Sequence, residues 1–222
     1  MPNQSAKRAP FQQIAFQVDI ARQMETPATL KAIIDFGAEC GYNELFLYGE
    51  GSLEYRSHPE CSSPWALKRD EFLMLQKHAT RHAMRLVPVI PLLGHANYIL
   101  KTVENEALRE VRDPDWAIFR CDMRQLCPSH PKTFDLIDDL VAEWSELVDA
   151  PYLHVGGDES WNFAVCPECR PKAEERGRGA LLADFFNCVN QIVKKHGKQT
   201  MIWHDMPFYY EDCLPHLDRD VI

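Results

Sequence analysis

The amino-acid sequence predicts an α/β fold with a parallel β-sheet, either open or closed into a barrel. Short apolar runs typical of buried strands alternate along the chain with longer segments whose apolar residues recur at helical spacing. This alternation favours parallel strands joined by helices. The chain has 222 residues, 45% of them hydrophobic and 26% charged, which suffices for one globular domain with a substantial core.

The first predicted unit is a strand, a helix and a second strand. Residues 13–20 contain the apolar residues of a strand, and Thr26 followed by Pro27 is typical of a helix start, with threonine as the N-cap. Gly41 is placed to end this helix. The apolar run at residues 45–48 then predicts the second strand.

The middle of the chain is less regular. Helical spacing predicts a second helix over residues 72–83, and residues 86–90 form the apolar run of a third strand. A further helix is expected through Leu100 and Leu108, followed by an irregular stretch as far as Pro128.

The second half of the chain has the clearest periodicity. Residues 134–148 form an apolar stripe with acidic residues on the opposite face, which predicts a helix leading to a buried strand at residues 152–155. A second stripe over residues 181–193 is closed by Gly197, and a fifth strand is expected at residues 200–203. We find no repeats or linkers, so one domain accounts for the chain.

Charge and composition narrow the classes of partner. A net charge of −9, without clustered lysine and arginine, argues against a nucleic-acid partner and favours a neutral or polar substrate. No segment approaches the ~20 apolar residues of a membrane span, and the polar residues 1–13 lack the apolar core of a signal peptide. We therefore expect a cytoplasmic protein with reduced thiols, without a membrane partner and in an unknown oligomeric state.

Two adjacent acids, Asp158 and Glu159, follow the strand at residues 152–155 and the corner formed by Gly156 and Gly157. Adjacent residues on a continuing strand face opposite ways, so both acids can serve one cleft only if the strand ends before them. The two glycines make such a corner possible. For an isolated Asp-Glu pair, a solvated acidic loop is the alternative interpretation.

Polar side chains follow every predicted strand. They are Asp19 and Arg22 after the first strand, Glu50 after the second, His95 after the third, Asp158 and Glu159 after the fourth, and His204 and Asp205 after the fifth. In a (β/α)₈ barrel the loops after the strands open on one face, where the active sites of that fold lie. This convergence predicts an enzyme, although each residue alone could be a solvated loop residue. Trp203 could equally be a core residue or a platform for a sugar.

Cys166 and Cys169 have the spacing of half a zinc knuckle. A structural zinc site needs four ligands, and no second pair at a suitable spacing is present. Cys121 and Cys127 could contribute only through long-range geometry. We therefore interpret Cys166 and Cys169 as free thiols and predict neither a metal nor another cofactor.

The segment HVGGDE at residues 154–159 resembles the His-x-Gly-Gly-Asp-Glu signature of family 20 glycoside hydrolases, the β-N-acetylhexosaminidases. Further segments are similar to the hexosaminidase D-like branch, in order along the chain: LFLYGE (45–50), PLLGH (91–95), YILK (98–101), LREV (108–111) and WHDM (203–206). The resemblance implies a (β/α)₈ TIM barrel that is incomplete here, with about five to six βα units, because the chain ends where a sixth strand should begin. Residues 13–222 would form this partial domain, after a polar extension at residues 1–12.

The resemblance also implies an activity, the retaining hydrolysis of terminal GlcNAc or GalNAc by an exo-β-N-acetylhexosaminidase. In such enzymes the nucleophile is the substrate's own 2-acetamido oxygen. Glu159 would be the general acid, and Asp158 would orient the acetamido group and stabilise the oxazolinium intermediate. The resemblance assigns six further residues to the sugar pocket or to the support of the acids: Arg22, Glu50, His95, His154, Trp203 and Asp205.

Two other functions stay open from the sequence alone. One is a carbohydrate-binding or inactive relative that holds a sugar without cleaving it. The other is a metal-dependent barrel enzyme such as a sugar isomerase, whose ligands would be His95, His154, Asp158 and Asp205. Whatever the function, an unclosed barrel has an edge strand without a partner. We therefore expect these 222 residues alone to aggregate.

Overall fold

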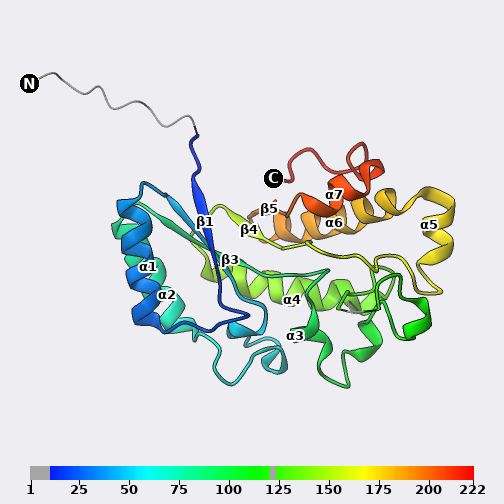
Figure 1. Cartoon of the computed structure of the whole chain (residues 1–222), viewed down its shortest axis with the longest axis horizontal. Helices are drawn as coiled ribbons and strands as arrows, with labels where there is room; N and C mark the ends of the chain where they lie inside the picture. Colours follow the sequence, from blue (N-terminus) through cyan, green and yellow to red (C-terminus); the bar gives the residue numbers. More distant parts are fainter. Residues whose placement is uncertain (1–10, 121–123) are drawn as a thin grey trace, which may run out of the picture.

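The computed structural model describes residues 11–120 and 124–222, and it contains one parallel β-sheet flanked by helices (Figure 1). The strands lie in the order in which they occur in the chain. They are β1 (Ala15–Asp19), β2 (Glu44–Tyr48), β3 (Arg85–Val89), β4 (Tyr152–His154) and β5 (Gln199–Met201). This confirms the predicted fold, an incomplete (β/α) barrel with five of the eight strands in the described part of the chain.

Long helices connect the strands and pack in pairs. They are α1 (Pro27–Glu39), α2 (Arg69–Arg81), α4 (Pro131–Leu147) and α6 (Arg178–Lys195). Three shorter helices lie in the loops: α3 (Asn97–Leu100), α5 (Arg170–Arg176) and α7 (Asp205–Tyr209). Helix α1 packs against α2, and α4 against α6 (Figure 1). None of the helices in residues 11–120 and 124–222 has the length and apolar character needed to cross a membrane.

The core forms where the apolar stripes of these helices meet the sheet. Trp144 of α4 is fully buried, and its ring meets Phe72 of α2 edge-on, with 5.0 Å between the ring centroids. The strands are parallel throughout, so their carboxyl ends meet along one edge of the sheet. This edge receives the loops that contain the predicted site residues.

The predicted helix through Leu100 and Leu108 is wrong. The chain forms only the single turn of α3, followed by a short 3₁₀ turn at Glu106–Leu108. Asn105 explains the break, because its side-chain amide donates to the Ile99 carbonyl and its backbone N–H donates to the Thr102 hydroxyl. Such local hydrogen bonds offer the backbone an alternative to a continuous helix.

Neither edge strand of the sheet has a second strand partner in the described part of the chain. Strand β1 pairs only with β2, and β5 pairs with β4. The last residue, Ile222, lies beside β5, since its N–H donates to the Thr200 carbonyl at 2.9 Å and its carbonyl accepts from the Ile202 N–H at 2.9 Å. The unpaired backbone N–H and C=O groups of an exposed edge strand can pair with strands of other chains. Aggregation of these residues alone stays a prediction.

The start of α1 offers a test of the local signals. Thr26 is the N-cap, as predicted, and its hydroxyl accepts from the Thr29 N–H at 3.1 Å. We expect Thr26→Ala to lower the free energy of unfolding by about 1 kcal/mol, because it removes this acceptor from a helix start. Thr26→Ser should keep most of the stability. Urea denaturation measures both variants, and equal losses in the two would contradict the capping role.

Candidate active site

His95 is the centre of the polar cluster at the carboxyl edge of the sheet. Its side chain is 5% exposed and contacts residues from other loops and strand ends. Nδ1 lies 2.9 Å from Arg22 Nη2 and 3.4 Å from Glu50 Oε1. Nε2 lies 3.1 Å from Glu159 Oε2 and 3.4 Å from Asp158 Oδ2. Residues that the sequence placed after four different strands therefore meet at one ring.

The contacts of His95 determine where its proton lies. Burial opposes protonation of the ring, but Glu50 and Asp158 outweigh it and raise the pKa of His95. Two guanidinium groups face Nδ1, because Arg124 Nη1 also lies 3.0 Å from this atom. An arginine only donates, so the Nδ1 of the neutral ring accepts and its remaining proton lies on Nε2. That N–H faces both carboxylates of the acid pair.

Glu50 lies on the Nδ1 side of His95. Its carboxylate accepts a hydrogen bond from Arg22, and its side chain is 17% exposed. Burial alone would raise the pKa of Glu50, but the neighbouring His95 ring and the Arg22 guanidinium lower it below its ordinary value. Glu50 is therefore an ionised acceptor on the Nδ1 side of His95 at neutral pH.

Gly156 and Gly157 form the predicted corner that ends the strand before the acid pair. Strand β4 ends at His154, and Gly156 and Gly157 then adopt φ values of 70° and 98°. A Cβ on Gly157 would lie 2.5 Å from the Phe186 ring, so a larger residue does not fit there. The corner turns the chain so that both acids reach His95. Glu159 is then anchored by its backbone N–H, which donates to Asp205 Oδ2 at 2.9 Å.

Backbone strain is concentrated in this cluster. Glu50, His95 and Glu159 have φ values of 43°, 53° and 48°, in the left-handed region that residues other than glycine rarely adopt. Among the non-glycine residues in 11–120 and 124–222, only Ala83 and Ala164 share this property. Such conformations persist where the surrounding structure enforces them, and they cluster at functional sites.

The two acids have different environments. The Asp158 side chain is 20% exposed and accepts from the Tyr48 hydroxyl at 3.4 Å, whereas the Glu159 side chain is 52% exposed. Burial raises the pKa of Asp158 against the opposing effect of His95, and the nearby acids Asp205 and Glu159 raise it further. Within the described residues, Asp158 Oδ1 and Asp205 Oδ1 are buried acceptors without a hydrogen-bond partner. The site therefore has spare acceptor capacity for a ligand.

His154 and Trp203 lie in an adjacent aromatic cluster. Their ring centroids are 4.4 Å apart, and the Phe46 ring lies 5.5 Å from His154. His154 is buried, its Nδ1 accepts from the Gly156 N–H at 3.1 Å, and burial lowers its pKa to about 3, so the ring is neutral. Their contact with substrate stays a prediction.

Sequence reasoning missed two members of the cluster. Tyr48 donates to Asp158, and Arg124 Nη2 lies 3.7 Å from Glu159 Oε2. Tyr48 could have been found, because it is the last residue of β2 and therefore lies at the carboxyl edge. Arg124 gives no such signal, since its loop has neither helical nor strand periodicity.

Comparison with known proteins identifies the family of this chain. A family model described as glycosyl hydrolase family 20, catalytic domain, matches residues 11–217. Lacto-N-biosidase of Bifidobacterium bifidum is 29% identical over 145 residues, which are 62% of this chain and 12% of that protein. Beta-hexosaminidase subunit beta of Entamoeba histolytica is 25% identical over 215 residues, 85% of this chain and 37% of that protein. The chain thus spans little more than a third of these relatives at most.

Solved structures agree on the fold. Chitobiase from Flavobacterium johnsoniae aligns with a TM-score of 0.78 and 21% identity, covering 96% of this chain and 33% of that one. An exo-β-N-acetylglucosaminidase of Vibrio harveyi, solved with N-acetylglucosamine, aligns with a TM-score of 0.78 and 19% identity over 96% and 37% of the two chains. These matches support the barrel fold. Since the family model spans nearly all described residues, including the acid pair and its supporting loops, the chain belongs to glycosyl hydrolase family 20.

Proposed function

We propose that the protein containing this chain is a retaining exo-β-N-acetylhexosaminidase that removes terminal GlcNAc or GalNAc. The observation that supports this most is the adjacent pair Asp158 and Glu159, which share the Nε2 side of His95 and differ in exposure. Because the chain spans 33% to 37% of the aligned structures, the activity is proposed for the whole protein.

Asp158 has the properties needed to bind the acetamido group. Its free, buried Oδ1 can accept the N–H of a 2-acetamido group, which would direct the amide oxygen toward the anomeric carbon. Burial raises the pKa of this acid, but a donated hydrogen bond and a nearby positive charge favour the ionised form. The oxazolinium intermediate supplies that positive charge.

Glu159 has the properties of the proton donor. Its half-exposed carboxyl group can reach a leaving group, while His95 and Arg124 contact its Oε2. In the first step the proton moves to the glycosidic oxygen, the bond from that oxygen to the anomeric carbon breaks, and the acetamido oxygen bonds to the anomeric carbon. In the second step Glu159 takes a proton from water as the water opens the oxazolinium. The two displacements retain the anomeric configuration.

Arg22 and Glu50 are placed to bind the sugar hydroxyls. They form an ion pair on the far side of His95, and the lowered pKa of Glu50 keeps an acceptor in place at neutral pH. The ring of Trp203, which packs against the neutral His154, would contribute an apolar wall to the sugar pocket.

The test compares substrates with and without the acetamido group. Nitrophenyl β-GlcNAc and β-GalNAc should release nitrophenol, and nitrophenyl β-glucoside, the matched control, should not. A thiazoline analogue of the oxazolinium should inhibit competitively. Equal cleavage of the glucoside would overturn the substrate-assisted mechanism. Binding of GlcNAc without turnover by the complete protein would instead identify a carbohydrate-binding relative.

A further inference from the structure

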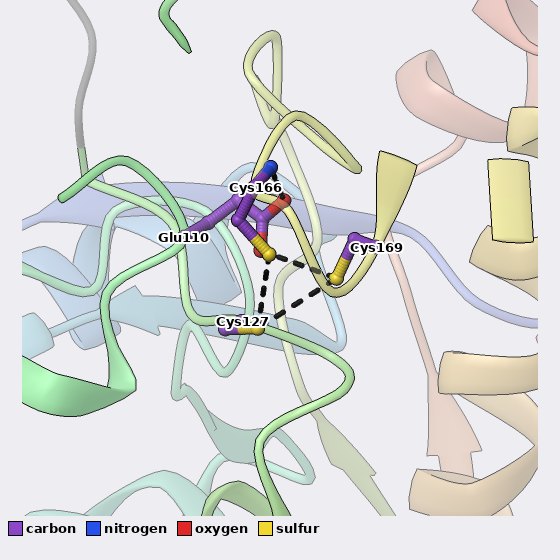
Figure 2. Close-up of side chains that lie close together, drawn as sticks. All are labelled: Glu110, Cys127, Cys166 and Cys169. Atoms are coloured by element: carbon purple, nitrogen blue, oxygen red, sulfur yellow. Dashed lines mark hydrogen bonds between the residues drawn. The ribbon is translucent and has the colours of Figure 1, made fainter. Parts of the chain in front are cut away.

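A second cluster of reactive side chains lies outside the acid-pair site. Glu110, Cys127, Cys166 and Cys169 point toward one another, and their ligand atoms all lie within 4.8 Å of one another (Figure 2). Each of the four side chains is at most 1% exposed. Only Cys166 and Cys169 are close together in the sequence; Cys127, which could contribute only through long-range geometry, and Glu110 reach them through folding. Cys121, the other candidate, lies outside the described residues.

The sulfur atoms have the spacing of a metal site. Cys127 Sγ lies 3.7 Å from Cys166 Sγ and 3.6 Å from Cys169 Sγ. Ligands about 2.3 Å from a tetrahedral zinc ion lie about 3.8 Å from one another, whereas disulfide sulfurs are about 2.05 Å apart. All three are free cysteines. The two sulfur-to-sulfur distances are therefore close to the distance between neighbouring ligands in a tetrahedral zinc site.

The Glu110 carboxylate is held in the orientation of a fourth ligand. Its Oε1 accepts from the backbone N–H groups of Val165 and Cys166, at 2.6 and 2.9 Å. Its Oε2 remains on the side of the sulfurs, 3.4 Å from Cys169 Sγ. A fully buried carboxylate is costly unless it is paired, hydrogen-bonded or bound to a metal. A cation among the sulfurs would neutralise it.

We propose that Glu110, Cys127, Cys166 and Cys169 bind one Zn²⁺ ion in a structural, tetrahedral site. Thiolate ligands favour soft or borderline metals, and a Cys-x-x-Cys pair with two ligands from elsewhere in the chain is typical of structural zinc. The complete burial and the four protein ligands leave no coordination position for water. The proposed site is therefore structural and independent of the hydrolytic reaction.

The proposed zinc would join two active-site loops. Glu110 and Cys127 belong to the loop after β3, whose two arms pair through Glu110 N–H to Gln125 O at 3.0 Å and Cys127 N–H to Leu108 O at 2.7 Å. Cys166 and Cys169 belong to the loop after β4 that also contains the acid pair. Arg124, which contacts His95 and Glu159, lies three residues before Cys127. The ion would thus hold Arg124 against the loop of the general acid.

Metal analysis of the purified protein, prepared without added metal, tests the site. We expect about one zinc per chain, and a strong loss of zinc in Cys166→Ser and Cys169→Ser. Cys213→Ser is the matched control, since Cys213 is equally buried and lies outside the cluster. Cobalt substitution should give the sulfur-to-metal charge-transfer band of a thiolate site. This readout uses the unaltered chain, so it holds even if a cysteine variant fails to fold.

Glu110→Gln tests the fourth ligand, because an amide keeps an acceptor for the two backbone N–H groups. We expect zinc affinity to fall by more than about tenfold, the smallest loss typical even for a residue that only hydrogen-bonds to a metal ligand. Unchanged affinity would overturn the assignment of the carboxylate as a ligand. Folded protein without zinc that takes up neither zinc nor cobalt would overturn the site itself, as would a disulfide between two of the three cysteines in the native protein. Equal zinc loss in Cys213→Ser would overturn it as well.

Discussion

Glu159→Gln is expected to lower kcat for a disaccharide substrate by about 10²- to 10⁴-fold, the range that a positioned general acid contributes. The effect should depend on the leaving group. The hydroxyl oxygen of a sugar leaves poorly unless it is protonated, whereas a dinitrophenolate leaves readily as an anion. The kcat of the variant for a dinitrophenyl glycoside should therefore fall less. Steady-state kinetics on the two substrates measures this difference.

The stability of this variant separates chemistry from folding. Glutamine keeps the shape of the side chain and an oxygen that can accept from His95 Nε2, and half of the side chain faces solvent. We therefore expect an unchanged melting temperature. Glu174→Gln, which alters an acid on α5, is the matched control and should leave kcat unchanged. Unchanged kcat of Glu159→Gln on the disaccharide would refute the assignment of the general acid.

The sequence could predict the convergence of the site because that convergence follows from the topology of a parallel sheet. Strands β2, β3 and β4 follow from apolar runs, and in a parallel sheet their carboxyl ends meet at one edge. Glu50, His95 and Glu159 each follow one of these strands, so periodicity alone places them together. The sequence was equally informative at Thr26, because a threonine followed by a proline is typical of a helix start and Thr26 is the observed N-cap of α1.

The conformation and contacts of the loop after β3 could not be predicted from the sequence. Its residues follow neither strand nor helix periodicity, and the hydrogen bonds of Asn105 with the Ile99 carbonyl and the Thr102 hydroxyl replace the helix that was expected there. Arg124 and Cys127 acquire their partners only when the loop folds onto the segment after β4. Spacing along the chain contains no information about such contacts. The same limit applies to Glu110, which looks like an ordinary loop acid in the sequence.

Asp158→Asn should have opposite effects on activity and on stability. An amide cannot carry the negative charge that stabilises the oxazolinium, so kcat should fall by about 10²- to 10³-fold, the cost of losing one preorganised electrostatic contact. At neutral pH the same change removes a carboxylate that is largely buried and lies near two other acids. We therefore expect the variant to be more stable than the wild-type protein at pH 7.

The pH dependence of this stability gain distinguishes it from a packing effect. Because the pKa of Asp158 is raised in the folded state, the folded protein holds this proton more tightly than the unfolded chain. Its contribution to stability is present below the unfolded pKa, about 3.9, and is lost as the pH rises through the folded value. The amide of the Asp158→Asn variant does not titrate, so the stability difference should grow from about pH 4 upward and then level off. Denaturation curves of both proteins across this range measure it, and a constant difference or a loss at every pH would show that the charge of Asp158 is not destabilising in the folded state.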